Sequence, residues 1–260
     1  MNIVTCIKQV PASSDVQVDP VTGVLIRDGN NTKMNPYDLY GIETALRIKE
    51  FNNAKVSTIT MGPPSAKQVL NESLWMGCDE ATLITDRKFA GADVVSTAYT
   101  LSQGILKQGQ FDLIICGKQT TDGDTAQVGP EIAEYLKIPH IAYVDNIIEI
   151  KEKSIVVSVS MDKTIEVWEV NFPCLITVEK GIYTPRLPSY KRSIKFKDYV
   201  IKELTLKDMN DVDESHYGLK GSPTQVERMF PPSKNNEKVI WEGKDLSKKM
   251  FEKLQDLKLL

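Results

Sequence analysis

The first 140 residues alternate short apolar runs with longer segments in which apolar side chains recur every three or four positions. Short apolar runs predict strands, and the 3.6-residue recurrence predicts helices that pack one side on a sheet. Strands are expected at residues 2–7, 56–61, 81–85 and 111–116, and helices at residues 36–49, 66–76, 92–106 and 131–137. Strands that alternate with helices of this length are typical of βαβ crossovers, so the pattern predicts an α/β protein with a doubly wound, mainly parallel sheet and helices on both faces.

Local residue choices predict where some of these elements begin and end. Asn35 is a favoured N-cap and Pro36 suits the first helical position, while Gly77 suits the residue after a helix. A polar, hairpin-like excursion is expected around residues 19–23, with alternating residues at 24–27.

The rhythm changes after Pro139. Four segments then have the composition of strands, at residues 141–150, 154–161, 164–170 and 174–178. They predict an antiparallel β addition at about 141–179, inside an α/β domain of residues 1–183. From residue 184 onward little regular structure is expected until a final amphipathic helix at about residues 245–257, with Leu246, Met250, Leu254 and Leu257 on one stripe. Such an arm predicts packing on another subunit or back on its own domain.

The most informative segment runs from Phe111 to Pro130. Phe111–Cys116 is too short for a helix and too apolar for an exposed strand, so it predicts a central parallel strand covered on both faces. A polar turn follows, and Pro130 is tolerated only near the start of the next helix. Doubly wound sheets bind ligands beyond the carboxyl ends of their strands, where the unpaired amides of a helix start face a phosphate. The segment therefore predicts a nucleotide site, with a plain strand-turn-helix connection as the alternative.

The two commonest nucleotide-binding motifs do not occur in the sequence. Lys118 is followed by Gln119, which does not fit a Walker A loop, and no GxGxxG sequence is found. The usual P-loop and dinucleotide-fingerprint classes are therefore disfavoured.

Composition disfavours several further classes of function. The chain has 260 residues and a formal net charge of -3 with 26% charged residues, which disfavours nucleic-acid binding through a basic face. Its 2 histidines, His140 and His216, are isolated, so neither a metal site nor a Ser-His-Asp triad is expected. The 4 cysteines lie far apart without a CxxC pair and are expected to be reduced packing residues. The amino terminus lacks signal-peptide features and no run of about 18 apolar residues occurs, which predicts a cytoplasmic protein without membrane insertion.

Eight short motifs occur in the order and at the spacing of one known family. They are Lys8–Pro11, Met34–Pro36, Met61–Pro64, Met76–Glu80, Cys116–Gln119, Asp122–Pro130, Pro173–Val178 and Gly221–Thr224. On these motifs the chain resembles, from residue 1 to 260, the β subunit of electron-transfer flavoprotein. One departure is the turn Met161–Thr164, where the family commonly has a charged, Gly-rich turn, so strand pairing near this turn is left open.

The resemblance implies a heterodimer with an α subunit that carries the electron-transferring FAD, while this chain binds a second FAD or AMP. Thr85–Asp93 is similar to the bifurcating branch, in which the second FAD accepts a hydride from NADH in anaerobic metabolism. Electrons would then pass towards ferredoxin and a flavin-dependent dehydrogenase, either acyl-CoA reductase-like (related to acyl-CoA dehydrogenases) or a hydroxy-acid enzyme such as a lactate dehydrogenase. A plainer interpretation of Thr85–Asp93 is a helix lead-in capped by Asp93.

Two other functions remain as alternatives. One is a simple electron carrier that holds structural AMP, and the other is a stand-alone adenine-nucleotide-binding module. In each redox reading the flavin carries the chemistry, so no catalytic side chain and no metal is expected.

The resemblance also implies which residues line the nucleotide. They are Cys6, Asn35, Pro36, Tyr37, Asp38, Met61, Asp122, Gly123, Asp124, Thr125, Ala126, Gln127, Val128 and Gly129. Carboxylates near a phosphate are unfavourable unless they face hydroxyls or a counter-charge. Asp122 and Asp124 are therefore assigned to ribose contacts or loop capping, with Arg87 or Lys118 as the cation.

Residues 184–198 correspond to the partner-recognition loop of the family, and residues 199–260 to an extended arm whose last helix clasps the α subunit. The partner-binding residues would be Arg186, Tyr190, Lys191 and Arg192. Tyr190 would anchor in the dehydrogenase while the cations steer it. Without the resemblance, the same residues are typical of a solvated basic turn.

Overall fold

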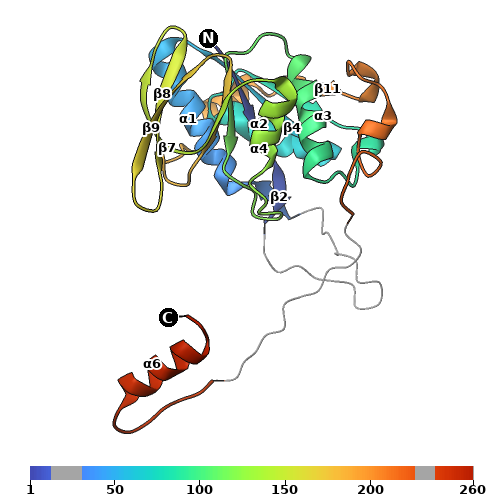
Figure 1. Cartoon of the computed structure of the whole chain (residues 1–260). Coiled ribbons are helices and arrows are strands. Elements are labelled where there is room, and N and C mark those ends of the chain that lie inside the picture. Colours follow the sequence, from blue (N-terminus) through green and yellow to red (C-terminus); the bar gives the residue numbers. More distant parts are fainter. Residues whose placement is uncertain (13–30, 226–237, 260) are drawn as a thin grey trace.

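The computed structural model describes residues 1–12, 31–225 and 238–259 (Figure 1). Within these residues the strands are β1 (Asn2–Cys6), β2 (Gln9–Pro11), β3 (Thr32–Met34), β4 (Lys55–Met61), β5 (Glu80–Ile84), β6 (Leu113–Gly117), β7 (His140–Ile150), β8 (Ser154–Ser160), β9 (Ile165–Asn171), β10 (Cys174–Val178) and β11 (Lys202–Leu204). The α-helices are α1 (Pro36–Asn52), α2 (Lys67–Met76), α3 (Val94–Leu106), α4 (Val128–Leu136), α5 (Tyr190–Lys195) and α6 (Leu246–Asp256).

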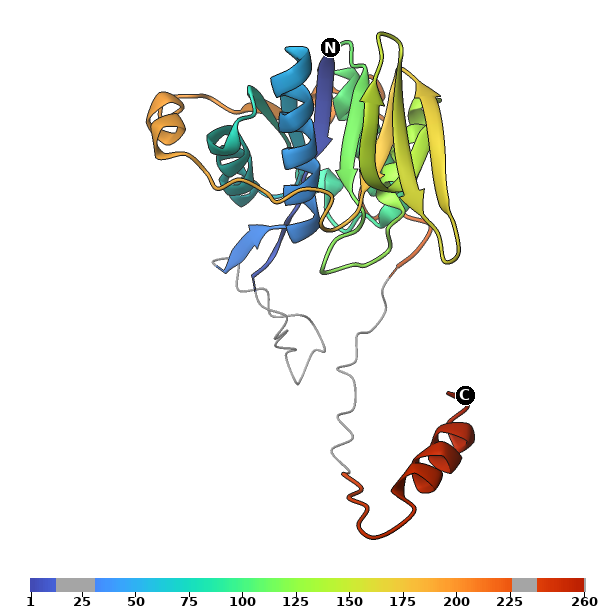
Figure 2. The same ribbon diagram turned by 90° about the vertical axis from the view of Figure 1, so that its left-hand side faces the viewer.

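The main sheet has the strand order β11-β5-β4-β1-β6-β10-β7-β8-β9. It is parallel from β11 to β7 and antiparallel from β7 to β9. Successive residues of a strand point to opposite faces. Ile3 and Ile115 accordingly pack with α1 and α2, whereas Val4 and Ile114 pack with α3 and α4. Figure 2 shows the helices on the two faces of the sheet. The predicted α/β fold, doubly wound with helices on both faces, is confirmed.

The first half of the chain forms its elements close to the predicted positions. Pro36 opens α1, and Gly77 follows α2 with φ 146°, a conformation that favours glycine. The Asp93 carboxylate caps α3 by accepting the Ser96 N–H at 3.0 Å. Phe111–Cys116 was expected to include a central strand, and β6 indeed lies between β1 and β10 with Ile114 and Ile115 fully buried.

The prediction of an antiparallel addition is correct for β8 and β9 but wrong for β10. β10 lies between β6 and β7 and is parallel to both, with Leu175 opposite Ile114. The reason is burial: Cys174–Val178 is buried at every position. A strand covered on both faces is typical of the inner part of a parallel sheet.

The expectation of little regular structure after residue 184 is wrong as far as residue 225. α5 forms at residues 190–195, and β11 adds a parallel edge strand beside β5. Leu204, Leu206 and Met209 join the core on the α3 and α4 side, and Tyr217 is only 1% exposed there. The scattered apolar residues of this segment therefore pack on the domain.

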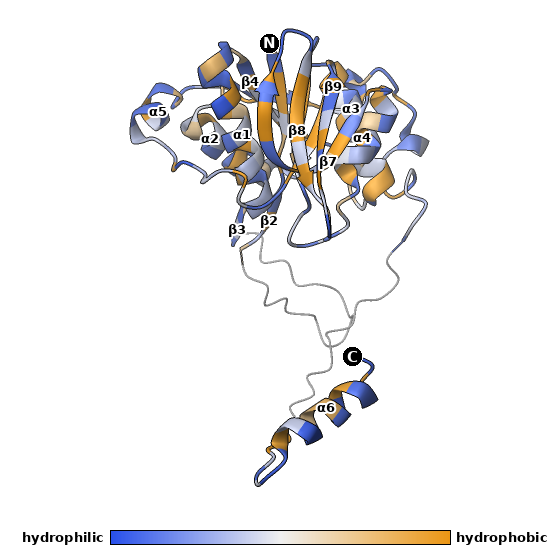
Figure 3. Ribbon diagram, turned by 60° about the vertical axis from the view of Figure 1, so that its left-hand side comes forward, coloured by the Kyte–Doolittle hydropathy of each residue, from blue (hydrophilic) through white to orange (hydrophobic). Residues whose placement is uncertain are grey.

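The last helix forms as predicted, over residues 246–256. None of its residues is buried, and its apolar positions lie open beside polar ones (Figure 3). β2 and β3 pair as an antiparallel two-stranded sheet on either side of residues 13–30, so the expected excursion around residues 19–23 lies outside the described residues. Among the residues that the structure describes, every helix is too short or too polar to span a bilayer.

Candidate functional site

The chain crosses over in opposite directions on the two sides of the β1–β6 pair. From β1 the following strands β4 and β5 are laid down on one side, whereas β6 is followed on the other side by β10 and β7. Cys6 and Cys116 face each other in register at the carboxyl ends of β1 and β6. In open α/β sheets this switch point is where ligands bind.

Two glycines bring helix starts close to this edge. A Cβ on Gly117, the last residue of β6, would lie 2.5 Å from Asp38 Oδ1 and 2.7 Å from the Tyr37 carbonyl carbon. A Cβ on Gly129, in the first turn of α4, would lie 2.6 Å from Thr177 Cγ2 of β10. The starts of α1 and α4 therefore approach the strand ends more closely than other residues allow.

Asn35 connects the start of α1 to the loop after β6. It is fully buried, and its Nδ2 donates to Asp38 Oδ1 and to the Gln119 carbonyl, each at 2.9 Å. Its Oδ1 accepts the Thr121 N–H at 3.3 Å. The sequence predicted an N-cap side chain, but α1 has no side-chain cap hydrogen bond. Asn35 instead joins two segments that are 84 residues apart.

Asp38 is a buried carboxyl group at the same edge. It is 5% exposed, and its Oδ2 accepts the Lys8 N–H at 2.7 Å. Burial raises the pKa of Asp38 to about 7, against the lowering effects of Asn35 and Lys8. The carboxyl group therefore titrates close to neutral pH.

The counter-charge for Asp122 is Lys8, which the sequence did not single out for this role. The Lys8 Nζ lies 2.8 Å from Asp122 Oδ2. Burial raises the pKa of Asp122, but the hydrogen bond and charge of Lys8 lower it more, so the net direction is downward. The expected cation Lys118 instead pairs with Glu179 at 2.6 Å, and Arg87 is exposed. The sequence signal that could have identified Lys8 is its position two residues after β1, which places it at the carboxyl edge of the sheet.

The loop after β6 is exposed and has an unusual backbone. Asp124 and Ala126 have φ values of 50° and 56°, and Ala126 has no side-chain polar group to favour that region. Gln119 Nε2 donates to Asp124 Oδ1 at 2.9 Å, which holds the turn. Strained backbone of this kind collects at binding sites.

The remaining predicted residues lie around the same edge. Met61 ends β4 and Cys6 ends β1, while Pro36 and Tyr37 form the first turn of α1. Gly123 and Thr125 are exposed in the loop, Gln127 precedes α4, and Val128 begins it. The amides at the start of α4 have no side-chain cap hydrogen bond, so they remain open to an anion. The residues that the resemblance assigns to a nucleotide thus lie along the same carboxyl edge of β4, β1 and β6.

Asp93 has a structural role in the segment Thr85–Asp93. Besides capping α3, its Oδ2 accepts the Thr224 N–H at 3.0 Å and the Thr224 hydroxyl at 2.7 Å, and its own N–H donates to Ser222 Oγ at 2.9 Å. The helix lead-in capped by Asp93, which was the plainer interpretation, is therefore present. Ser222 and Thr224 belong to the Gly221–Thr224 motif, so this motif is hydrogen-bonded to the start of α3.

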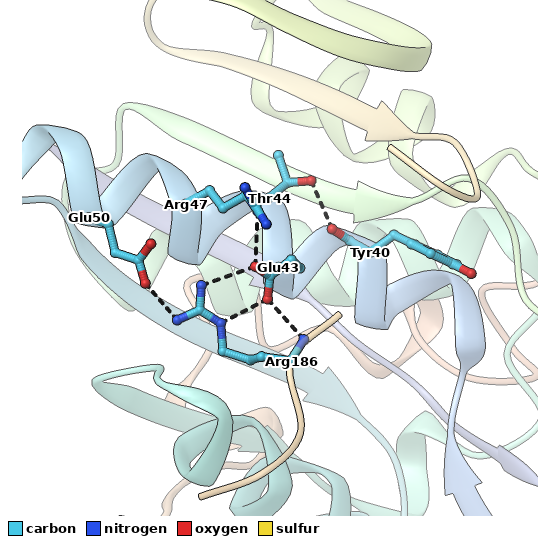
Figure 4. Close-up of polar contacts among 6 residues, drawn as sticks. All are labelled: Tyr40, Glu43, Thr44, Arg47, Glu50 and Arg186. Carbon is cyan, nitrogen blue, oxygen red and sulfur yellow. Dashed lines mark hydrogen bonds and ion pairs between the residues drawn. The ribbon is translucent and has the colours of Figure 1, made fainter. Parts of the chain in front are cut away.

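The predicted partner-binding residues differ in their exposure and in their bonds to the rest of the chain. Tyr190 is 81% exposed and Lys191 is exposed beside it. Arg186 is instead paired with Glu43 and Glu50 of α1 (Figure 4). Arg192 donates to the carbonyls of Leu74 and Cys78 at 2.7 and 2.5 Å. Two of the three cations are thus bonded within the chain.

The fold and this edge define a class: a doubly wound α/β protein whose candidate site lies at the switch point of its sheet. The family model described as "Electron transfer flavoprotein domain" matches residues 22–207. The chain belongs to the electron transfer flavoprotein family, among its β subunits, and its role is in electron transfer.

Several relatives cover most of the chain. The Clostridium acetobutylicum "Electron transfer flavoprotein subunit beta" is 45% identical over 228 residues, which is 88% of this chain and 87% of that protein. The Acetobacterium woodii "Caffeyl-CoA reductase-Etf complex subunit CarD" is 43% identical over 244 residues, 92% of each chain. The Sinorhizobium fredii "Protein FixA" is 39% identical over 246 residues, 92% of this chain and 86% of that protein.

Proposed function

We propose that this chain binds an FAD of its own at the ends of β1 and β6 and takes part, with an α subunit, in flavin-based electron bifurcation. The observation that carries the proposal is the meeting of α1, α4 and the loop after β6 at the switch point, joined by Asn35 and by the Lys8–Asp122 pair. Nucleotides bind at this position in open α/β sheets. The resemblance of Thr85–Asp93 to the bifurcating branch supports FAD over AMP.

The residues present fit the adenosine half of such a cofactor. The uncapped amides of α4 are donors for phosphate oxygens, and Gly129 leaves room for a close backbone approach. The exposed carboxylates of Asp122 and Asp124 are acceptors for ribose hydroxyls, and Lys8 balances the charge of Asp122. The positive charge of Lys8 therefore reduces the repulsion between the carboxylates and a phosphate bound at the same edge.

When bound, the isoalloxazine of FAD supplies the redox chemistry between NADH and the acceptors. This chain binds and orients the cofactor and contributes no nucleophile or general base. The acceptors proposed are ferredoxin and a flavin-dependent dehydrogenase. The relative from Acetobacterium woodii, named as part of a complex with caffeyl-CoA reductase, favours an acyl-CoA reductase-like partner over a lactate dehydrogenase-like one.

The C-terminal arm is proposed to hold the α subunit. Met250 and Phe251 of α6 are each 52% exposed and its C-cap residue Leu257 is 55% exposed, and no residue of α6 is buried in the described chain. An amphipathic helix with an uncovered apolar stripe gains stability by packing on a second surface. A stand-alone nucleotide-binding module would leave this stripe in water.

A carrier subunit with AMP is the second candidate. The contacts proposed above involve only the adenosine half, which AMP and FAD share, so they fit either cofactor. Both carboxylate oxygens of Asp93 accept hydrogen bonds within the chain, from the start of α3 and from Thr224. These structural bonds explain an Asp at this position without an FAD.

The deciding experiment is a cofactor count on the heterodimer purified with its α subunit. Acid extraction and chromatography should give two FAD per heterodimer, and one FAD with one AMP would refute the bifurcating assignment. Thr125→Ala and Asp124→Ala should lower the content of the second nucleotide. They should also destabilise the heterodimer, because a bound ligand stabilises the folded state by mass action. Asp162→Ala, in the exposed turn between β8 and β9, is the matched control.

A further inference from the structure

Residues 186–195 carry three exposed apolar side chains close together. Leu187, Tyr190 and Ile194 are 87%, 81% and 59% exposed. Tyr190 and Ile194 are four residues apart in α5 and therefore lie on the same side of that helix. Lys191 and Lys195 are exposed around them. We call Leu187, Tyr190 and Ile194 the apolar knob.

The first attachment of this segment is a partly buried ion pair with α1. Arg186 Nε lies 2.8 Å from Glu43 Oε2, its second terminal nitrogen lies 3.0 Å from Oε1, and its backbone N–H donates to Oε2 at 3.1 Å (Figure 4). Glu43 is only 2% exposed. Burial raises the pKa of Glu43, but the Arg186 hydrogen bonds and charge lower it more, so the carboxylate is ionised. A bidentate pair of this kind fixes direction as well as distance.

The second attachment is to the end of α2. Arg192 Nε donates to the Leu74 carbonyl at 2.7 Å and its terminal nitrogen to the Cys78 carbonyl at 2.5 Å. The Ser189 N–H donates to the Trp75 carbonyl at 3.0 Å. The last carbonyls of a helix lack partners inside the helix and carry partial negative charge, so a guanidinium suits them. The segment that carries the knob is therefore held at two points, by Arg186 before the knob and by Arg192 between Tyr190 and Ile194.

We propose that Glu43 and Arg192 are positioning residues for docking of the electron-accepting dehydrogenase. They hold the apolar knob in its binding arrangement before the partner arrives, so that little ordering remains to oppose association. The occupant is a flavoprotein surface with an apolar pocket and an acidic rim, because Lys191 and Lys195 flank the knob. This inference rests on the proposed docking role of residues 184–198.

The test uses the heterodimer and the acyl-CoA dehydrogenase that the wild-type heterodimer reduces fastest. Glu43→Gln should raise KM for that dehydrogenase about 5- to 20-fold with kcat within about 2-fold, because a neutral amide no longer matches the charged fork. Hydrogen exchange of the Arg186 and Ser189 amides should accelerate in the free heterodimer, while flavin content stays unchanged. Glu50→Gln removes the same charge from the exposed partner of the same guanidinium and should change KM less than about 2-fold.

Arg192→Met and Tyr190→Ala complete the set. Arg192→Met acts on the other attachment and should raise KM as Glu43→Gln does, which keeps the test valid if Glu43→Gln folds poorly. The positioning role is overturned if Glu43→Gln and Glu50→Gln change KM equally, or if KM is unchanged in both Glu43→Gln and Arg192→Met. In either case the docking role still stands if Tyr190→Ala raises KM. An unchanged KM in Tyr190→Ala would instead reject the docking role and the inference with it.

Discussion

The Lys8 ammonium lies 2.8 Å from a carboxylate oxygen of Asp122, and this pair joins the chain after β1 to the loop after β6. Both side chains are partly exposed, at 45% and 33%. An ion pair in such a place contributes only about 0–1 kcal/mol to stability by itself. Its main effect is to place one positive charge at an edge that otherwise presents carboxylates.

Lys8→Met should therefore weaken nucleotide binding more than it weakens folding. We expect roughly 3- to 10-fold lower affinity for the second nucleotide and a loss of unfolding free energy below about 1 kcal/mol. Equilibrium dialysis of the heterodimer and thermal unfolding measure the two effects. Lys55→Met, which breaks an exposed pair with Glu80 elsewhere, is the control, and equal losses of affinity in both variants would contradict the assignment.

Asn35→Ala should destabilise the protein. The buried side chain makes three hydrogen bonds, and its removal leaves the Gln119 carbonyl and the Thr121 N–H without this partner. A loss of about 1–3 kcal/mol is expected in chemical denaturation, together with reduced nucleotide content. Asn52→Ala, which removes an exposed amide at the end of α1, should stay within about 0.5 kcal/mol of wild type. Equal losses in the two variants would show that Asn35 has no special structural role.

Gly129→Ala should be destabilising and specifically repairable. Its Cβ would lie 2.6 Å from Thr177 Cγ2, so a cost of about 1–3 kcal/mol is expected from overpacking. Thr177→Ser deletes that methyl group and keeps the hydroxyl that accepts the Tyr143 N–H. The double variant should recover most of the loss in a double-mutant cycle. Gly123→Ala, whose Cβ would be 3.5 Å from Thr120 Oγ1, should fold like wild type.

Asp38 should make stability depend on pH. Its pKa is raised from 3.8 to about 7 in the folded state, so between these values the folded chain binds more protons than the unfolded chain. The contribution of Asp38 is therefore fully present below about pH 4 and is lost as pH rises towards 7, with a slope of at most about 1.4 kcal/mol per pH unit. Carboxylates with lowered pKa, such as Asp122, act in the opposite direction at lower pH.

Asp38→Asn isolates this effect, because asparagine does not titrate. Its free energy of unfolding should be flatter than that of wild type between pH 4.5 and pH 7, apart from a constant offset caused by the changed hydrogen bond with Asn35. Denaturant titrations at several pH values provide the comparison. Parallel curves for the two proteins would mean that the Asp38 carboxyl is ionised throughout this range.

The elements in the first half of the chain were predictable because their signals are local. The buried run of β6 and the Pro36 and Gly77 boundaries depend on neighbouring residues and were placed within a few positions. The gathering of Cys6, Met61 and the loop after β6 followed from the rule that parallel strands share a carboxyl edge. The direction of β10 was not predictable from its place after two antiparallel strands, although its sequence, apolar at every position except Thr177, carried the signal.

Other parts of the site depend on pairings that periodicity does not encode. Lys8 and Asp122 are 114 residues apart in the sequence, and Arg186 and Glu43 are 143 residues apart. Arg186 and Arg192 were expected to face a partner because the resemblance places them in the partner-recognition loop, and the basic run itself shows no acceptor within the chain. Their actual acceptors, the Glu43 carboxylate and the last carbonyls of α2, come into reach only after the sheet has formed.

One helix serves two distant tasks in this molecule. Asn35 just before α1 and Asp38 in its first turn lie at the carboxyl edge of β1 and β6, and Glu43, little more than a turn further along, holds the segment that bears Tyr190. A substitution that shifts α1 should therefore disturb the hydrogen bonds of Asn35 and the Glu43–Arg186 pair together. Substitutions in the exposed residues of α5 should therefore cost little stability, whereas substitutions of the buried residues of α1 affect both contacts.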